Sequence, residues 1–253
     1  MPAERPPDSP ADGHDRPAQA AALAPRWGLG DAAAGFLVAL LLSAILAGVW
    51  TGATGEEELS LGGQALAELG LWTGLVGCVV LAAKRKGSGR LDTDFGFTAR
   101  WVDVPMGAVV GALAHEVLVP IVAFLMRPLV GEPDISGPAE ELFEKATGLS
   151  AAILVLFVVV GAPLVEELFF RGLVLRSLQR RVGAVAAILL CGVLFGLAHP
   201  QPLDADALAL LMVSLAAFGA VLAVLAMRTG RLGAPIVAHA TFNAWTAVFL
   251  LAK

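Results

Sequence analysis

Apolar residues form long runs along most of this chain. Each run is close to the roughly 20 apolar residues with which a helix crosses a hydrocarbon layer about 30 Å thick. Because lipid offers no partner for a backbone amide, such runs predict helices rather than strands. We therefore expect an all-α membrane bundle of seven transmembrane helices, or eight if Pro120 divides the third run. The runs lie near residues 32–50, 65–83, 104–130, 149–170, 183–198, 206–227 and 234–252.

The composition agrees with this architecture and narrows the partners. Of the 253 residues, 57% are hydrophobic and only 15% are charged, and the mean hydropathy is +0.78. A soluble domain rarely has this balance, so we expect the lipid bilayer as a partner and no nucleic acid. Residues 1–26 are rich in Pro, Ala and Asp and show no periodicity, which predicts a disordered tail. Residues 27–253 are expected to form one membrane domain.

Charged residues alternate in sign from one connection to the next. Lys and Arg are retained on the cytoplasmic side of a membrane, so the basic connections are expected there. With seven helices this alternation places the N-terminus inside, whereas an eighth helix would move one terminus. The basic connections lie at residues 84–100, 176–181 and 228–231, and the acidic connections lie at 56–58, 132–144 and 204–206.

Ionisable side chains inside the predicted helices are the candidates for chemistry. Each costs on the order of 2.5 to 3.5 kcal/mol at the centre of a membrane helix, so such residues usually have a function. Glu167 and Arg171 are four residues apart, the spacing of an ion pair on one helix face. Glu166 lies about 100° around the helix from Glu167 and is left free to face another partner. His239 and Asn243 are also four apart and share a face.

The rise of a helix brings two of these groups to one depth and sets a condition for a third. Glu166 lies 16 residues before Val182 and His199 lies 17 residues after it, so both are about 25 Å from the turn of a helical hairpin. His239 is six residues past Gly233, about 9 Å into its own helix. The three side chains therefore meet only if the arginine-bearing hairpin protrudes into the cytoplasm.

A carboxylate and two imidazoles in one pocket suit the hydrolysis of a peptide bond. Glu166 is expected to act as the general base for a water molecule that His199 holds and polarises. His239 and Asn243 are expected to donate hydrogen bonds to the oxyanion, where the loss of one donor typically costs about 2.7 to 4 kcal/mol.

These segments resemble the CPBP family of intramembrane peptidases, also called the CAAX-protease and bacteriocin-processing family. Its pattern is Glu-Glu-x-x-x-Arg, then Phe-x-x-x-His, then His-x-x-x-Asn, and all three parts occur in this order within roughly residues 150–250. The resemblance implies a helical fold with a cavity open to the cytoplasm and a glutamate-dependent endopeptidase, which in eukaryotic members acts on prenylated CAAX proteins. It implies catalytic roles for Glu166, His199, His239 and Asn243, with Glu167, Arg171 and Phe195 as supporting residues.

No cofactor is expected to be required. The family was long described as metalloproteases, but this chain has no HExxH motif, and Glu166, His199 and His239 are only an alternative set of zinc ligands. A metal-free glutamate mechanism is favoured. The chain is rich in Ala, Gly, Leu and Arg and has no Tyr, which favours a bacterial inner membrane. The resemblance implies that the active site faces the cytoplasm. There a prenylated substrate need not exist.

Several of these residues also have a plain structural interpretation. Glu167 with Arg171 is more often a pair that orients a helix than one that takes part in chemistry. Phe195 is expected to pack below His199. Glu166 and its three partners could also be a polar network that only holds helices together.

Five further residues are expected to affect the packing or the shape of the helices. His115 and Glu116 lie in the middle of the third run, where they either line the same cavity or snorkel at a helix irregularity. Gly107 and Gly111 predict close helix packing. Pro163 leaves a backbone carbonyl unpaired and should bend its helix near Glu166.

Two other functions fit part of the pattern. A non-catalytic protein on the same scaffold, such as a bacteriocin-immunity or anchoring factor, would not depend on Glu166 or His199. A transporter of small solutes or protons also carries intramembrane acids, but the two halves of this chain show no internal repeat. The sequence determines neither the substrate nor the oligomeric state.

Overall fold

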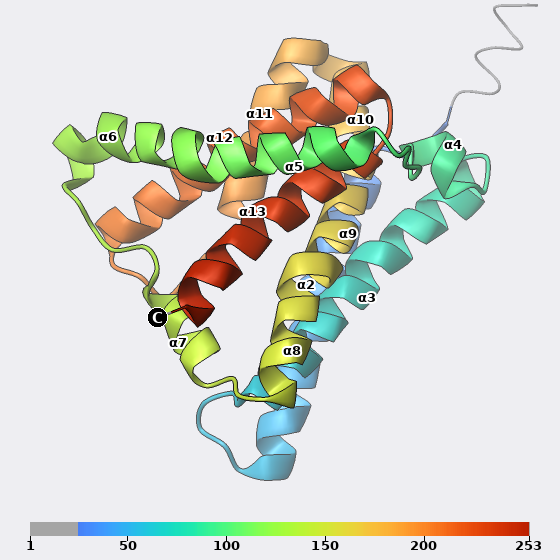
Figure 1. Ribbon diagram of the computed structural model, residues 1–253. Coiled ribbons are helices and arrows are strands. Elements are labelled where there is room, and N and C mark those ends of the chain that lie inside the picture. Colours follow the sequence, from blue (N-terminus) through green and yellow to red (C-terminus); the bar gives the residue numbers. More distant parts are fainter. Residues whose placement is uncertain (1–24, 253) are drawn as a thin grey trace, which may run out of the picture.

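The computed structural model describes residues 25–252 (Figure 1). Within this range every regular element is a helix, which confirms the all-α prediction. The tail predicted for residues 1–26 lies almost wholly outside the described residues. The elements are α2 (Leu29–Thr54), α3 (Leu61–Lys86), α4 (Leu91–Phe95), α5 (Asp103–Leu113), the π-helical turn η2 (Ala114–Leu118), α6 (Val119–Val130), α7 (Gly137–Glu144), α8 (Leu149–Leu156), η3 (Phe157–Gly161), α9 (Ala162–Glu167), η4 (Leu168–Val174), α10 (Leu175–Val182), α11 (Ala184–Leu197), α12 (Ala205–Thr229) and α13 (Gly233–Leu251).

Six helical segments of the described chain are long and apolar enough to cross a membrane, so the predicted count of seven to eight is not confirmed. The run near 183–198 forms α11, which has only 14 residues. At 1.5 Å per residue this is about 21 Å, short of a hydrocarbon layer about 30 Å thick. The third run is not divided, because Pro120 follows the π-helical turn η2 and the helix continues to Val130.

The fourth span is the longest helical segment in the described chain. It runs from Leu149 to Val182 and has 34 residues, up to roughly 50 Å at the rise of an α-helix. Because the hydrocarbon layer is only about 30 Å thick, this helix must tilt or extend beyond it. Its length is compatible with the protruding hairpin that the sequence requires for the three polar side chains to meet.

The three basic connections lie together at one end of the bundle. The backbone N–H of Gly233 donates to the carbonyl oxygen of Thr98 over 3.0 Å, which joins the connection after α3 to the one after α12. Nη2 of Arg176 donates to the carbonyl oxygen of Gly230 over 3.0 Å, which adds the end of the fourth span. The basic connections that the sequence assigns to one side of the membrane are therefore joined to one another in the structure.

Glycines let the helices around the fourth span approach closely. Gly107 and Gly111 of α5 face α13, and a Cβ atom added to Gly111 would lie 2.2 Å from the carbonyl oxygen of Ala238. The close packing predicted for this pair is confirmed, and it occurs within the chain, where α5 lies against α13 (Figure 1). Because His239 follows Ala238, this contact fixes the position of the histidine.

The π-helical turn η4 lies at the centre of the described bundle. All seven of its residues are buried. Helices α2, α3, α11 and α12 contact it from different sides, and α2 also lies along α3, as α11 does along α12. The segment that follows Glu166 and Glu167 is thereby held on several sides.

Candidate active site

Three separate elements bring Glu166 together with two histidines. Glu166 lies at the end of α9, His199 follows α11, and His239 lies in α13. Oε2 of Glu166 is 3.5 Å from Nε2 of His199 and 3.9 Å from Nε2 of His239. The side chains that the sequence places at one depth therefore meet in the structure.

The other nitrogen of each ring has a partner that determines its protonation. Nδ1 of His199 is 2.7 Å from the carbonyl oxygen of Phe195, and Nδ1 of His239 is 3.0 Å from Oε1 of Glu167. Carbonyl and carboxylate oxygens only accept hydrogen bonds, so each Nδ1 carries a proton. Each Nε2 is then the free position of its ring, and both face Glu166. Oε2 of Glu166 is buried without a hydrogen-bond partner, so these three atoms are arranged to share a proton or a polar ligand.

Glu167 and Arg171 form the ion pair that their spacing predicts. Nη1 of Arg171 donates to Oε1 of Glu167 over 2.8 Å, and neither side chain has exposed surface. Nη2 of Arg171 donates to the carbonyl oxygen of Gly219 over 3.0 Å, which joins η4 to α12. The same Oε1 atom of Glu167 accepts the proton of His239 Nδ1. The pair therefore fixes a helix, as predicted, and also orients one of the two rings.

Phe195 lies against both histidines. Its ring centroid is 4.6 Å from that of His199 and 5.6 Å from that of His239. The guanidinium carbon of Arg171 is 4.4 Å from the centroid of the same ring, a distance at which the face of an aromatic ring attracts a cation. Phe195 is buried, so its contacts agree with the packing role that the sequence predicts.

Asn243 completes a hydrogen bond that Pro163 cannot make. In a π-helical turn each N–H donates to the carbonyl five residues earlier, as Ala162 does to Phe157 at the end of η3. The next pair would be Pro163 and Val158, but proline has no N–H. The side-chain amide of Asn243 donates to this carbonyl of Val158 over 2.8 Å. One N–H of Asn243 is thus committed to the backbone of the fourth span, and its role at an oxyanion stays a prediction.

Glu68 of α3 is a further acidic residue that interacts with the site, although its sequence position matches no motif. It interacts electrostatically with Glu166 and His199, and it interacts with the indole N–H of Trp72. That indole nitrogen is buried and has no hydrogen bond of good geometry. The available signal is a lone acid in the apolar run at 65–83, because the membrane cost that selects Glu166 applies to Glu68 as well.

His115 and Glu116 pair with each other. Nδ1 of His115 is 2.8 Å from Oε1 of Glu116. The His115 ring meets Phe242 edge-on, with centroids 5.4 Å apart, and stacks on Phe249 at 6.0 Å. The Glu116 side chain is 50% exposed, which agrees better with a place on the outside of the bundle than with one in the cavity.

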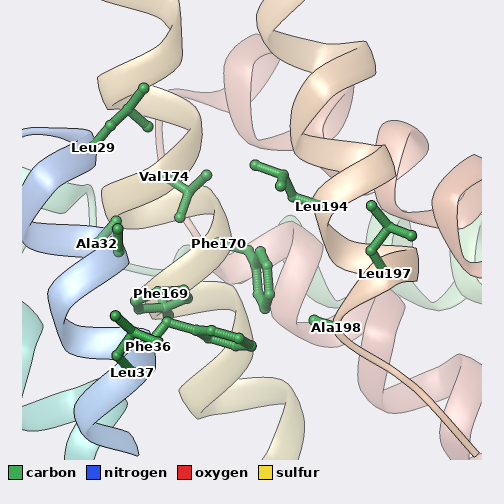
Figure 2. A pocket seen from close by; sticks show the side chains of 11 residues that line it. Leu29, Ala32, Phe36, Leu37, Phe169, Phe170, Val174, Leu194, Leu197 and Ala198 are labelled. Atoms are coloured by element: carbon green, nitrogen blue, oxygen red, sulfur yellow. The ribbon is translucent and has the colours of Figure 1, made fainter. Parts of the chain in front are cut away.

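An apolar pocket of about 490 Å³ adjoins the cluster (Figure 2). This volume lies in the range of ligand-binding pockets. Ala198 in its lining directly precedes His199, and Phe170 meets Phe195 edge-on with centroids 5.2 Å apart. Figure 2 shows that the lining comes from α2, from η4 and from the end of α11, and it consists of Leu29, Ala32, Ala33, Phe36, Leu37, Phe169, Phe170, Val174, Leu194, Leu197 and Ala198.

The zinc alternative concerns the same three side chains, Glu166, His199 and His239. The bonds at both Nδ1 atoms are of the kind that orients metal-bound imidazoles. Residues 25–252 nevertheless contain no group of three or more His, Cys, Asp or Glu side chains whose geometry could hold a metal ion. The metal-free mechanism stays the favoured prediction.

Comparison with known protein families matches residues 148–245 to the family described as Type II CAAX prenyl endopeptidase Rce1-like. The chain therefore contains an Rce1-like domain. This domain runs from α8 into α13 and includes the whole cluster around Glu166, which confirms the predicted resemblance to CAAX proteases. Rce1-like proteins are generally proteases, and with six apolar helices the chain is an integral membrane protein. No curated protein and no solved structure matches the chain.

The bond from Asn243 to Val158 predicts an interaction between two substitutions in the Rce1-like domain. Asn243→Ala should lower the free energy of unfolding by about 1 to 3 kcal/mol, because a buried carbonyl loses its donor. In a Pro163→Ala background the new backbone N–H can reach Val158, so the same substitution should cost less than half as much. Thermal unfolding of the four proteins in detergent measures this coupling. An equal cost in both backgrounds would mean that Asn243 does not replace the donor that proline lacks.

Proposed function

We propose that this Rce1-like protein is an intramembrane endopeptidase that hydrolyses a peptide bond of a membrane-associated substrate with water activated by Glu166. The observation that carries the proposal is the convergence of Oε2 of Glu166 with the Nε2 atoms of His199 and His239. A carboxyl oxygen buried without a hydrogen bond is costly in a membrane. An anchoring or immunity factor does not need an unpaired carboxyl oxygen, whereas a peptidase needs one to act as a general base.

The partners of the two rings assign them different tasks. Nδ1 of His199 donates to a carbonyl group, so the neutral form of the ring presents Nε2 as an acceptor for a hydrogen bond from the attacking water. Nδ1 of His239 donates to the carboxylate of Glu167, which holds the ring with Nε2 toward Glu166. When this Nε2 carries a proton, it can donate a hydrogen bond to the oxyanion. These tasks agree with the roles that the sequence predicts for both histidines.

The different roles of His199 and His239 define the steps of the reaction. Glu166 takes one proton of the water while the oxygen of that water bonds to the carbonyl carbon of the substrate. The carbonyl oxygen becomes an oxyanion. His239 stabilises this oxyanion, and the second side-chain N–H of Asn243 is assigned the same role. When the tetrahedral intermediate collapses, the bond between carbon and nitrogen breaks, and the nitrogen takes the proton that Glu166 holds, which restores the carboxylate. The products are a carboxylic acid and an amine.

The apolar pocket of Figure 2 supports a substrate that carries a lipid chain. A peptide alone would bring backbone amides into this pocket, where their unpaired N–H and C=O groups would cost several kcal/mol each. A prenyl chain has no such groups. The pocket reaches Ala198, next to His199, so a prenyl group bound there places the adjoining peptide near Glu166. A CAAX-type prenylated cysteine is the substrate class that fits both features.

The loop charges and the site together favour one orientation in the membrane. With the basic connections in the cytoplasm, the substrate would enter from the cytoplasmic side, and the composition favours a bacterial inner membrane.

Labelling of a cysteine introduced at Ser88 checks this orientation. In intact cells, a thiol reagent that does not cross membranes should react with this cysteine only after the membrane is permeabilised, because the position is cytoplasmic.

The activity predicts the effect of one isosteric change. Glu166→Gln keeps the size of the side chain and removes the base, so cleavage of a fluorescent peptide ending in a farnesylated CAAX sequence should fall at least 10²-fold. Thermal unfolding in detergent should be unchanged or improved, because an unpaired carboxyl group is removed. Glu116→Gln is the matched control, since this carboxyl group also lies in a membrane helix and pairs with His115. Full cleavage by Glu166→Gln would remove Glu166 from the mechanism.

Filling the pocket should weaken binding of the lipid chain. Ala33 lines the pocket, whereas its neighbour Ala34 does not, so Ala33→Phe fills the pocket and Ala34→Phe is its control. For the farnesylated peptide, Ala33→Phe should raise KM at least tenfold and leave kcat nearly unchanged, because only substrate binding is affected. Equal KM values for both variants would indicate that the lipid chain binds elsewhere.

A further inference from the structure

Carboxylates at the basic end of the described bundle already have donors. Three of them form ion pairs, and the fourth, Asp94, accepts from the backbone N–H of Ser88 over 2.9 Å. Because these acids are taken, they leave the other basic side chains of that end without a counter-ion. The three pairs are Lys86 with Asp31, Arg90 with Asp92 and Arg231 with Asp103.

Arg180 and Arg181 lie at the end of α10 and have no carboxylate partner among residues 25–252, yet both are held in place. Nη2 of Arg180 donates to the carbonyl oxygen of Trp27 over 2.6 Å, and the guanidinium carbon lies 3.9 Å from the centroid of the Trp27 ring. The guanidinium group of Arg181 lies beside Gly28, where a Cβ atom would be 3.3 Å from Nη1. Both groups therefore lie against the residues that precede α2, and their charges repel each other.

The rule that places basic residues in the cytoplasm does not explain this arrangement. That rule concerns only the sign of the charge on a connection, and like charges move apart when nothing holds them. Here a hydrogen bond and a cation–π contact keep Arg180 next to Arg181. Two neighbouring guanidinium groups without a carboxylate suit an anion with several oxygens, above all a phosphate group.

The apolar pocket leads to these two arginines, which we call the arginine cluster. Leu29, in its lining, is the first residue of α2 and directly follows the residues that hold the cluster. Val174, also in the lining, precedes Arg181 by seven residues, two turns along the same helix face. Figure 2 shows Leu29 and Val174 at one end of the pocket and Leu37 and Ala198 at the other. The pocket therefore extends from the arginine cluster towards the active site.

The arginine cluster lies at the border between lipid headgroups and lipid tails. Val185 and Leu189 of α11, just beyond the turn after Arg181, are 72% and 59% exposed. Exposed apolar side chains on a membrane helix face lipid tails. The paired charges of Lys86 and Asp31 near the start of α2 mark the polar side of this border.

We propose that the arginine cluster and the apolar pocket together bind one acidic phospholipid. The phosphate group lies between the two guanidinium groups, and one acyl chain enters the pocket past Leu29 and Val174. Free phosphate would use the arginines without the pocket, and a zwitterionic lipid would bring a second cation to a cationic site. A phospholipid with a net negative charge, such as phosphatidylglycerol, fits both parts. This binding does not depend on the proposed peptidase function.

Native mass spectrometry of the full chain in a neutral detergent tests the proposal. With equal amounts of phosphatidylglycerol and phosphatidylcholine of the same acyl chains, the protein should retain one phosphatidylglycerol with a preference of about tenfold or more. The combined change Arg180→Gln and Arg181→Gln should reduce this preference to less than about twofold. Lys84→Gln with Arg85→Gln is the matched control, because it removes the same charge from exposed residues at the end of α3. A preference that survives in the arginine variant, or is lost equally in the control, would overturn the headgroup site.

Further variants keep the test informative if the double variant folds poorly. Arg181→Gln leaves the contacts of Arg180 with Trp27 intact and should still lower the preference. Ala33→Phe fills the pocket and should weaken binding of phosphatidylglycerol, whereas Ala34→Phe should not. Glycerol phosphate that binds as tightly as the whole lipid would contradict the place of the acyl chain.

The acids of the N-terminal segment offer a competing occupant for the arginine cluster. Phosphatidylglycerol that bound only after these acids were changed to the corresponding amides would make that segment the occupant and the proposal wrong. The acids are Glu4, Asp8, Asp12 and Asp15.

One consequence rests on the proposed function. If the prenyl chain of the substrate uses the same pocket, phosphatidylglycerol should raise the KM of the farnesylated peptide at least about threefold and leave kcat unchanged. The arginine double variant should not show this effect. Lipid binding without competition would leave the phospholipid site standing and place the prenyl chain elsewhere, whereas loss of cleavage in every variant would concern the peptidase function alone.

Discussion

The whole arrangement depends on one buried ion pair, Glu167 with Arg171. In a membrane an unpaired charge is expensive, and a buried pair is tolerated only when its remaining donors and acceptors find partners. Here the guanidinium group reaches the backbone of α12 at Gly219, and the carboxylate reaches His239 in α13. Two helices, α12 and α13, are thereby tied to one point in the fourth span. Glu166, one residue earlier and about 100° around the helix, is left facing the rings.

The site also requires the π-helical turns of the fourth span. Irregular backbone at membrane depth needs partners for the groups it frees, because lipid supplies none. The fourth span carries two π-helical turns, one on each side of the Glu166–Glu167 pair. The carbonyl of Val158 that Pro163 leaves unpaired receives the amide of Asn243. The same bond that repairs the helix therefore holds α13, and with it His239, beside the fourth span.

Much of the fold follows from the sequence. Because lipid offers no hydrogen-bond partner for a backbone amide, each long apolar run must form a helix. The seven apolar runs all form helices, of which the fourth continues twelve residues beyond its expected end. The meeting of Glu166 and His199 followed from counting residues along their helices, whereas His239 required the fourth span to be longer than its apolar run. The predicted count of membrane spans is not confirmed at α11, because a helix of 14 residues is shorter than a hydrocarbon layer is thick. The interaction of Glu68 with Glu166 and the hydrogen bond from Asn243 to Val158 both depend on which helices are neighbours. Spacing along one helix carries no such information.

The central claim is that Glu166, His199 and His239 surround the reacting bond of a lipid-bearing peptide. A structure of the Glu166→Gln protein with an uncleaved farnesylated peptide tests this claim most directly. The account predicts the scissile carbonyl within one bridging water of residue 166 and of both Nε2 atoms, with the farnesyl chain between α2 and α11. A peptide bound with its scissile bond on another face of the bundle would contradict it.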